Sequence, residues 1–188
     1  AKAKEIAQII PEGITCIFIR QQEQLGLGHA ILCAEKAVGN EPFAILLADD
    51  FISGHNNTSS LIRRFENSLN SQLSYINVNG PEISNYGVIK STDNESGVSG
   101  VVEKPPSEKA PSKKAIMGRY VLSPDIFSHL KKSKPSINNE IQLTDAIDKL
   151  AASGKVDAFQ LLGKRFDCGS VKGYLEAIIY QAKHSKIM

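Results

Sequence analysis

Residues 43–50 read Phe43-Ala-Ile-Leu-Leu-Ala-Asp-Asp50, and this stretch indicates the fold more strongly than any other. Its six apolar residues form a short, continuous run, which is typical of a strand that is buried on both faces. Such strands lie in mostly parallel sheets that helices cover on both sides. The stretch therefore predicts a central, mostly parallel sheet, with Asp49 and Asp50 at the carboxyl end of one of its strands.

The segments before this strand alternate between helix and strand. We expect a helix over residues 1–10 and a buried strand at Ile14–Ile19, because this second run is short, apolar and rich in β-branched residues. Another helix is predicted to open at Gly26-Leu-Gly28 and to end at Gly39.

After residue 50 the predicted secondary structure is a helix, then short strands separated by turns, and then helices again. A helix is expected near Leu61–Leu69, and the later predicted strands are Leu73–Val78, Tyr86–Lys90, Val98–Glu103, Ala115–Leu122 and Val156–Leu162. Further helices are predicted after Ser123-Pro124, around Leu143–Leu150 and after the cap Ser170, the last with an apolar stripe of Val171, Tyr174, Leu175, Ile178, Ile179 and Ala182. This order predicts an α/β sandwich.

Composition excludes several classes of protein. The 188 residues form one domain or a large piece of one, and 22 basic against 20 acidic residues leave no basic stripe for nucleic acid. Cys16, Cys33 and Cys168 are widely spaced and form no zinc or disulfide pattern. No apolar run is long enough for a membrane span and no signal peptide is recognisable, so we expect a cytoplasmic protein without a membrane partner.

Candidate binding residues follow the predicted strands, where open α/β sheets bind their ligands. Asp49 and Asp50 could hold Mg²⁺ beside phosphate oxygens, or one of them could simply cap the next element. Gln21 and the Gly26-Leu-Gly28 turn could approach a ligand closely, or the glycines could only start a helix.

Two other charged segments have the same two interpretations. Glu103 could accept hydrogen bonds from sugar hydroxyls and Lys104 could neutralise a phosphate, although exposed charges of this kind more often form a solvated surface pair. Asp167, between a strand and the last helix, is either a turn residue or a third acid of the site. His29 is expected to be a structural hydrogen-bond partner, because no nucleophile pairs with it.

Taken together and in order, these segments resemble the bacterial UTP–glucose-1-phosphate uridylyltransferases. The resemblance runs from about residue 14 to residue 184. It is most specific in Gly26-Leu-Gly-His-Ala30 and Glu140-Ile-Gln-Leu-Thr-Asp-Ala-Ile147, and it includes Tyr86-Gly-Val88, Val101-Val-Glu-Lys-Pro105, Gly118-Arg-Tyr-Val-Leu122 and Asp167-Cys-Gly-Ser170.

This resemblance implies a Rossmann-like nucleotidyltransferase fold, an α/β/α sandwich with a mixed sheet. It also implies the reaction of UTP with glucose 1-phosphate to give UDP-glucose and pyrophosphate, with Mg²⁺ as cofactor and a homo-oligomer as the assembled form. The implied site residues are Gln21, Gly26 and Gly28 at the uracil, Gly87 and Glu103 at the glucose, Lys104 at the sugar phosphate, and Asp49 with Asp167 at the metal.

One departure from the family pattern is large. The family begins with a strand and a Gly-x-Gly-Thr-Arg loop that cradles the triphosphate, and nothing in residues 1–188 resembles this loop. We therefore expect residues 1–188 to be the C-terminal two thirds of a single nucleotidyltransferase domain and to be inactive alone. The alternatives are a glucose-1-phosphate thymidylyltransferase and a non-catalytic sugar-nucleotide-binding module.

Overall fold

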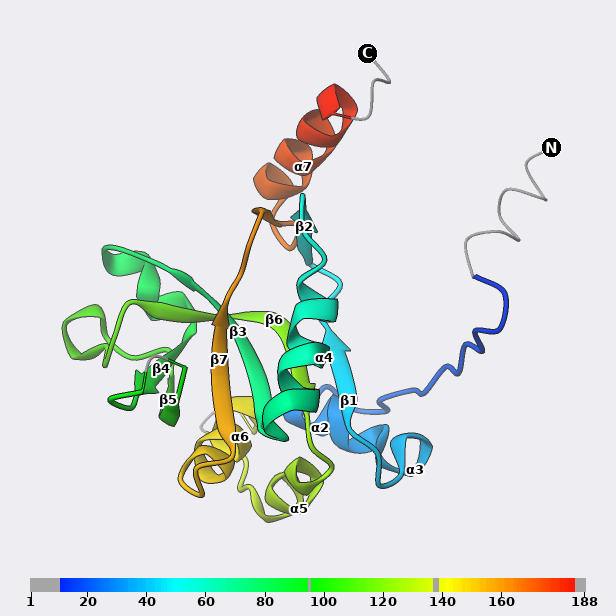
Figure 1. Cartoon of the computed structure of the whole chain (residues 1–188), viewed down its shortest axis with the longest axis vertical. Coiled ribbons are helices and arrows are strands. Elements are labelled where there is room, and N and C mark those ends of the chain that lie inside the picture. The colour runs from blue at the N-terminus through cyan, green and yellow to red at the C-terminus, as the bar shows by residue number, and fades with distance from the viewer. Residues whose placement is uncertain (1–10, 95, 137–138, 185–188) are drawn as a thin grey trace.

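The computed structural model describes residues 11–94, 96–136 and 139–184, and its centre is a six-stranded mixed sheet (Figure 1). The strands run in the order β5-β4-β6-β3-β7, and β1 also pairs with β6. Their bounds are β1 Phe43–Leu46, β3 Ser71–Asn77, β4 Gly87–Ser91, β5 Val98–Glu103, β6 Lys114–Leu122 and β7 Val156–Gln160. The predicted helix over residues 1–10 lies outside the described residues.

Most strand pairs in this sheet are antiparallel, so the expectation of a mostly parallel sheet is wrong. Only β3 and β7 pair in parallel, whereas β1, β3 and β4 all run antiparallel to β6. The apolar run that opens at Phe43 is accordingly only half-buried, with a burial pattern that alternates along β1. Its inward residues pack on one face of the sheet, as when Phe43 stacks on Phe127 with ring centroids 5.1 Å apart.

The strand predicted at Ile14–Ile19 does not form. These residues belong to no helix or strand, and Phe18 is 95% exposed. A β-branched apolar run has a strand's local preference, but a strand also needs a neighbour to satisfy its backbone groups. No strand of the described residues lies beside this segment, which leads away from the sheet (Figure 1).

Helices cover both faces of the sheet. The helices α2 Leu27–Cys33, α5 Asp125–Lys132 and α6 Leu143–Ala151 pack together around the larger core, whose strand residues include Leu73. Gln72, which precedes Leu73 on β3, faces the opposite side of the sheet. Its side-chain amide donates a hydrogen bond to Ser68 Oγ at the end of α4 Asn57–Ser68. The short elements are α3 Glu35–Val38 and the 3₁₀ turns Pro81–Asn85 and Ser107–Lys109. The predicted α/β sandwich is confirmed.

Predicted helix ends are confirmed in part. Ser170 caps α7 Val171–His184 through its hydroxyl, which accepts a hydrogen bond of 3.0 Å from the Gly173 N–H. Ser123 precedes α5 as expected, but its buried hydroxyl caps no N–H of that helix. The apolar stripe of α7 is exposed rather than packed against the described residues, with Val171 80% exposed.

A second, two-stranded sheet sits beside the carboxyl end of β1. It pairs β2 Asp50–Ser53 antiparallel with β8 Lys164–Asp167, and Asp50 is opposite Asp167. Two acidic segments that are more than a hundred residues apart in the chain thus come together. In the part of the chain that the structure describes, no helix has the length and apolar character needed to cross a bilayer.

Candidate functional site

A cavity of about 340 Å³ opens where the main sheet meets the small sheet. Its volume is within the range of small-molecule sites. It brings together five of the residues that the sequence indicated, namely Asp49, Gly87, Glu103, Lys104 and Asp167. Gln142, Leu143 and Thr144, from the start of α6, line the same cavity.

One wall of the cavity comes from the paired strands β4 and β5. Gly87 lies directly opposite Glu103 in this pairing, and the Lys104 N–H donates to the Tyr86 carbonyl at 3.1 Å. Lys104 has a left-handed backbone with φ 42°, which turns the chain as the strand ends. Its ammonium lies 3.9 Å from Glu103 Oε1, and 62% of its side chain is exposed. The wall thus offers a carboxylate and an exposed cation.

Gly87 could not be replaced by a larger residue without a clash. A Cβ at this position would lie 2.8 Å from Thr144 Cγ2 and 3.4 Å from Glu103 Oε2. The absence of a side chain therefore keeps the backbone of β4 open toward the cavity.

Two carboxylates, those of Asp49 and Asp167, lie near each other in the lining of the same cavity. A Cβ built on Gly169 would lie 3.3 Å from Asp49 Oδ2 and 3.2 Å from Asp167 Oδ1, so the two oxygens are separated by no more than the sum of these distances. Both side chains belong to exposed residues. Asp167 Oδ1 also accepts from the Gly169 N–H at 3.1 Å, which holds the carboxylate in place.

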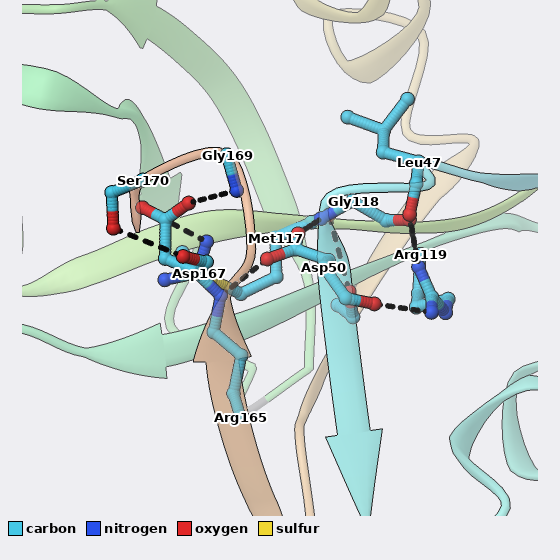
Figure 2. A network of polar contacts seen from close by, with 10 residues as sticks. Leu47, Asp50, Met117, Gly118, Arg119, Arg165, Asp167, Gly169 and Ser170 are labelled. Carbon is cyan, nitrogen blue, oxygen red and sulfur yellow. Dashed lines mark hydrogen bonds and ion pairs between the residues drawn. The ribbon is translucent and has the colours of Figure 1, made fainter. Parts of the chain in front are cut away.

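Asp50 is used differently from its neighbour. It is only 5% exposed, and its Oδ2 accepts a hydrogen bond of 2.6 Å from the Gly118 N–H. Its Oδ1 forms a hydrogen-bonded ion pair with Arg165, which Figure 2 shows beside Asp167. Although burial favours loss of the proton from Arg165, Asp50 raises the pKa of this guanidinium above its ordinary value. The pair ties β2, β6 and β8 together.

This arrangement fits a divalent cation held by few protein ligands. No group of three or more acidic, histidine or cysteine side chains that could bind a metal occurs in residues 11–94, 96–136 and 139–184. Two opposed carboxylates are nevertheless the usual protein share of a magnesium site, in which substrate phosphates and water supply the other ligands. Asp49 and Asp167 match this donor set, whereas Asp50 is already neutralised by Arg165.

Three of the indicated residues do not line the cavity directly. Gly26 and Gly28 pack against residue 141, where a Cβ would lie 2.9 Å and 2.7 Å, respectively, from the Ile141 carbonyl oxygen. Leu27, between them, lines the cavity. The Gln21 amide is hydrogen-bonded to the Gly26 carbonyl and to His29, so Gln21 lies next to this wall. The structure therefore shows a packing role for Gly26 and Gly28, namely close contact with Ile141.

Three cavity residues were not predicted from the sequence. Arg165 has no motif of its own and is recognisable only from its place two residues before Asp167. Thr144 has a buried hydroxyl without a partner among the described residues, and its only signal in the sequence is that it lies in the segment Glu140–Ile147, which resembles the family. Burial raises the pKa of the Tyr120 phenol, and Asp50, Glu103 and Asp49 raise it further, so the phenol stays protonated as a donor.

Comparisons with known proteins identify the family of this chain. A family model described as nucleotidyl transferase matches residues 2–184. A UTP–glucose-1-phosphate uridylyltransferase of Haemophilus ducreyi is 40% identical over 97% of this chain and 66% of its own length, and that of Escherichia coli K12 is 40% identical over 97% and 64%. The chain spans about two thirds of the length of the curated relatives it matches.

Solved structures give the same result. A UDP-glucose pyrophosphorylase complexed with UDP-glucose superimposes with a TM-score of 0.83 at 43% identity, over 89% of this chain and 66% of that one. The fold, the order of the motifs and the identities together show that the chain belongs to the nucleotidyl transferase family, alongside UTP–glucose-1-phosphate uridylyltransferases.

Proposed function

We propose that this chain carries the sugar-nucleotide-binding part of a UTP–glucose-1-phosphate uridylyltransferase. The observation that carries the proposal is one cavity that is lined both by Gly87, Glu103 and Lys104 and by the carboxylates Asp49 and Asp167. Relatives at about 40% identity bear this enzyme's name, which favours it over a thymidylyltransferase. In this proposal, residues 1–188 are the C-terminal two thirds of one domain.

The wall formed by β4 and β5 is proposed to hold the glucose phosphate. Glu103 has a half-buried carboxylate that accepts hydrogen bonds from sugar hydroxyls, and the open backbone at Gly87 lets the sugar lie close to the strand. Lys104 is proposed to pair with the phosphate on the sugar. Its ammonium is exposed, and its ion pair with Glu103 is long, at 3.9 Å, so the ammonium can also contact a phosphate.

The carboxylate wall is proposed to hold the metal. Members of this family typically use a divalent metal ion, and we propose Mg²⁺ bound by Asp49 and Asp167 together with phosphate oxygens. When bound, the ion supplies charge that offsets the negative phosphates. Gln21, with Gly26 and Gly28, is proposed to face the uracil from the neighbouring wall.

The chemistry requires no covalent intermediate with the protein. A phosphate oxygen of glucose 1-phosphate forms a bond to the α-phosphorus of UTP, while the bond from that phosphorus to the bridging oxygen of the β-phosphate breaks and pyrophosphate leaves. The protein's part is to align the two substrates and to offset their charge, and Lys104 is the residue proposed to do this at the attacking phosphate.

The location and the assembly are part of the same proposal. All three cysteines, Cys16, Cys33 and Cys168, are free thiols, which is typical of a reducing compartment and supports the cytoplasm. The exposed apolar stripe of α7 supports a homo-oligomer as the assembled form.

Equilibrium binding of UDP-glucose to residues 1–188, measured by calorimetry with and without Mg²⁺, tests the proposal. We expect saturable binding that Glu103→Ala weakens and that Glu108→Ala, an exposed acid outside the cavity, leaves unchanged. Absence of binding to a folded chain, or equal effects of the two substitutions, would contradict the proposed site. An assay of UDP-glucose synthesis by the whole protein distinguishes the two remaining alternatives, because a non-catalytic binding module would show no turnover.

A further inference from the structure

The phenol of Tyr120 is a buried polar group that no neighbouring group uses. Tyr120 is only 6% exposed, belongs to the larger core and lines the cavity between the two sheets. Its hydroxyl forms no hydrogen bond with any of residues 11–94, 96–136 and 139–184. Buried phenols normally have a partner, because burial removes their contacts with water. The unpaired hydroxyl therefore indicates a partner that arrives with a ligand.

The sheet holds this phenol in a fixed place. On its two sides, Tyr120 pairs with Ile45 of β1 and with Leu73 of β3. A side chain on a central strand, with its ring packed in the core, needs little ordering when a ligand binds. The hydroxyl of Tyr120 is therefore a preorganised group of the cavity.

The surroundings of the phenol make it a hydrogen-bond donor. Burial raises its pKa, and the charges of Asp50, Glu103 and Asp49 raise it further, so the phenol keeps its hydrogen. None of these carboxylates accepts that hydrogen, and Asp50 already pairs with Arg165. Among the described residues, Tyr120 is thus a donor without an acceptor.

We propose that Tyr120 determines sugar specificity by donating its phenol hydrogen to one hydroxyl group of the hexose. This inference rests on the proposed function, in which the same cavity holds the glucose. A sugar hydroxyl suits the position because it is neutral and both accepts and donates hydrogen bonds. It accepts from Tyr120 and is free to donate to a carboxylate such as Glu103, whereas an anion at the same place would be repelled by the acids around the phenol.

The consequence is discrimination against hexoses that lack this hydroxyl group. A site that is built to hydrogen-bond a hydroxyl rejects an analogue without it, because the protein's own buried group is then left unpaired. The contribution of Tyr120 is confined to the sugar, so binding of UDP alone does not use it.

One substitution isolates the phenol oxygen. Tyr120→Phe removes this oxygen and keeps the ring in the core. Tyr174→Phe is the matched control, because it removes the same atom from a side chain that is 55% exposed on α7, outside the cavity. The assay is calorimetry on residues 1–188 with UDP-glucose, with UDP and with the four UDP-glucose analogues that lack the hydroxyl at C2, C3, C4 or C6, together with the urea midpoint of each variant.

We expect Tyr120→Phe to weaken UDP-glucose binding by about threefold to tenfold, the effect of one hydrogen bond, and UDP binding by less than about twofold. One of the four deoxy analogues should bind to the unchanged chain and to Tyr120→Phe with the same affinity, because the accepting oxygen is already absent. The other three should keep the loss. Tyr174→Phe should change no affinity.

Three results would overturn the inference. Equal losses for UDP and UDP-glucose would place the phenol at the phosphates or the metal instead of the sugar. Equal losses for all four deoxy analogues would show that Tyr120 bonds no sugar hydroxyl, and an unchanged affinity for UDP-glucose would show that it makes no contact.

The urea midpoint separates binding from folding. Tyr120→Phe should not lower it, because the phenol has no partner among the described residues. A lower midpoint would show that the phenol stabilises the fold, and it would contradict the role in binding. If the folded, unchanged chain binds neither UDP-glucose nor UDP, the proposed function itself fails. Binding of UDP-glucose that Tyr120→Phe leaves intact overturns the role of Tyr120 alone.

Discussion

Replacing Asp50 by asparagine should lower the free energy of unfolding without changing the affinity for the metal. The carboxylate is 5% exposed and accepts from two donors, the Gly118 N–H at 2.6 Å and the Arg165 guanidinium. An asparagine has one acceptor oxygen, so its NH₂ group would face one of these donors. Arg165, whose side chain is 17% exposed, would also lose the charge that compensates it.

The size of the effect follows from these contacts. Removing one partner of a buried ion pair costs about 3–5 kcal/mol, because the other charge remains buried without compensation. For a chain of this length about 1 kcal/mol lowers the melting temperature by roughly 2–4 °C, so the midpoint should fall by about 6–20 °C. Asp49→Asn, at an exposed position one residue away, is the matched control and should change stability by less than about 0.5 kcal/mol.

The assay is urea unfolding of residues 1–188, followed by circular dichroism, with Mn²⁺ binding measured separately by electron paramagnetic resonance. Asp49→Asn should lose Mn²⁺ affinity while remaining folded. The double variant Asp50→Asn/Arg165→Met should lose less stability than the two single variants together, because they share one pair. A loss below about 1 kcal/mol for Asp50→Asn, or an equal loss for Asp49→Asn, would refute the assignment of the two acids.

Three other substitutions or assays test the remaining parts of the site. Lys104→Ala should weaken UDP-glucose binding by roughly tenfold to a hundredfold, which is the cost of losing one charge-assisted contact. The urea midpoint should not change, because the side chain is mostly exposed. An affinity within twofold of that of the unchanged chain would exclude Lys104 from the site. Gly87→Ala should abolish UDP-glucose binding, because the new Cβ would lie 2.8 Å from Thr144 Cγ2. Adding Thr144→Ser removes that methyl group and should restore part of the binding in the same calorimetric assay. If the second substitution restores no binding, the clash with Thr144 is not the cause. Residues 1–188 should show no synthesis of UDP-glucose from UTP and glucose 1-phosphate in a coupled pyrophosphate assay, because they contain no glycine-rich triphosphate loop to stabilise the leaving group; turnover would contradict this view of where the phosphates are held.

Local patterns predicted the positions of the helices and of most strands well. Leu143, Ala146, Ile147 and Leu150 recur at helical spacing, and all four are buried in α6. The directions of the strands could not be predicted in the same way. An apolar run such as Phe43–Leu46 is compatible with either direction, and its neighbour β6 lies some seventy residues further along the chain. Pairing is a long-range property that composition does not encode.

The candidate site was predictable where a residue type alone suggests its chemistry. Glu103, Lys104, Asp49 and Asp167 carry charge at the ends of strands, and the structure brings them to one cavity. The different roles of Asp49 and Asp50 were not predictable, because they depend on Arg165, which pairs with Asp50 only through the β2–β8 sheet. Likewise, the contact between Gln21 and His29 becomes visible only when α2 places the two side chains 2.9 Å apart.

A crystal structure of residues 1–188 with UDP-glucose and Mn²⁺ tests the central claim most directly, because anomalous scattering locates the ion. We predict glucose hydroxyls at Glu103 and the Gly87 backbone, Mn²⁺ between Asp49 and Asp167, and the uracil beside Gln21. The contradicting result is a ligand bound elsewhere, such as the separate hollow lined by Val78, Pro81 and Ser107, with the cavity between the two sheets left empty.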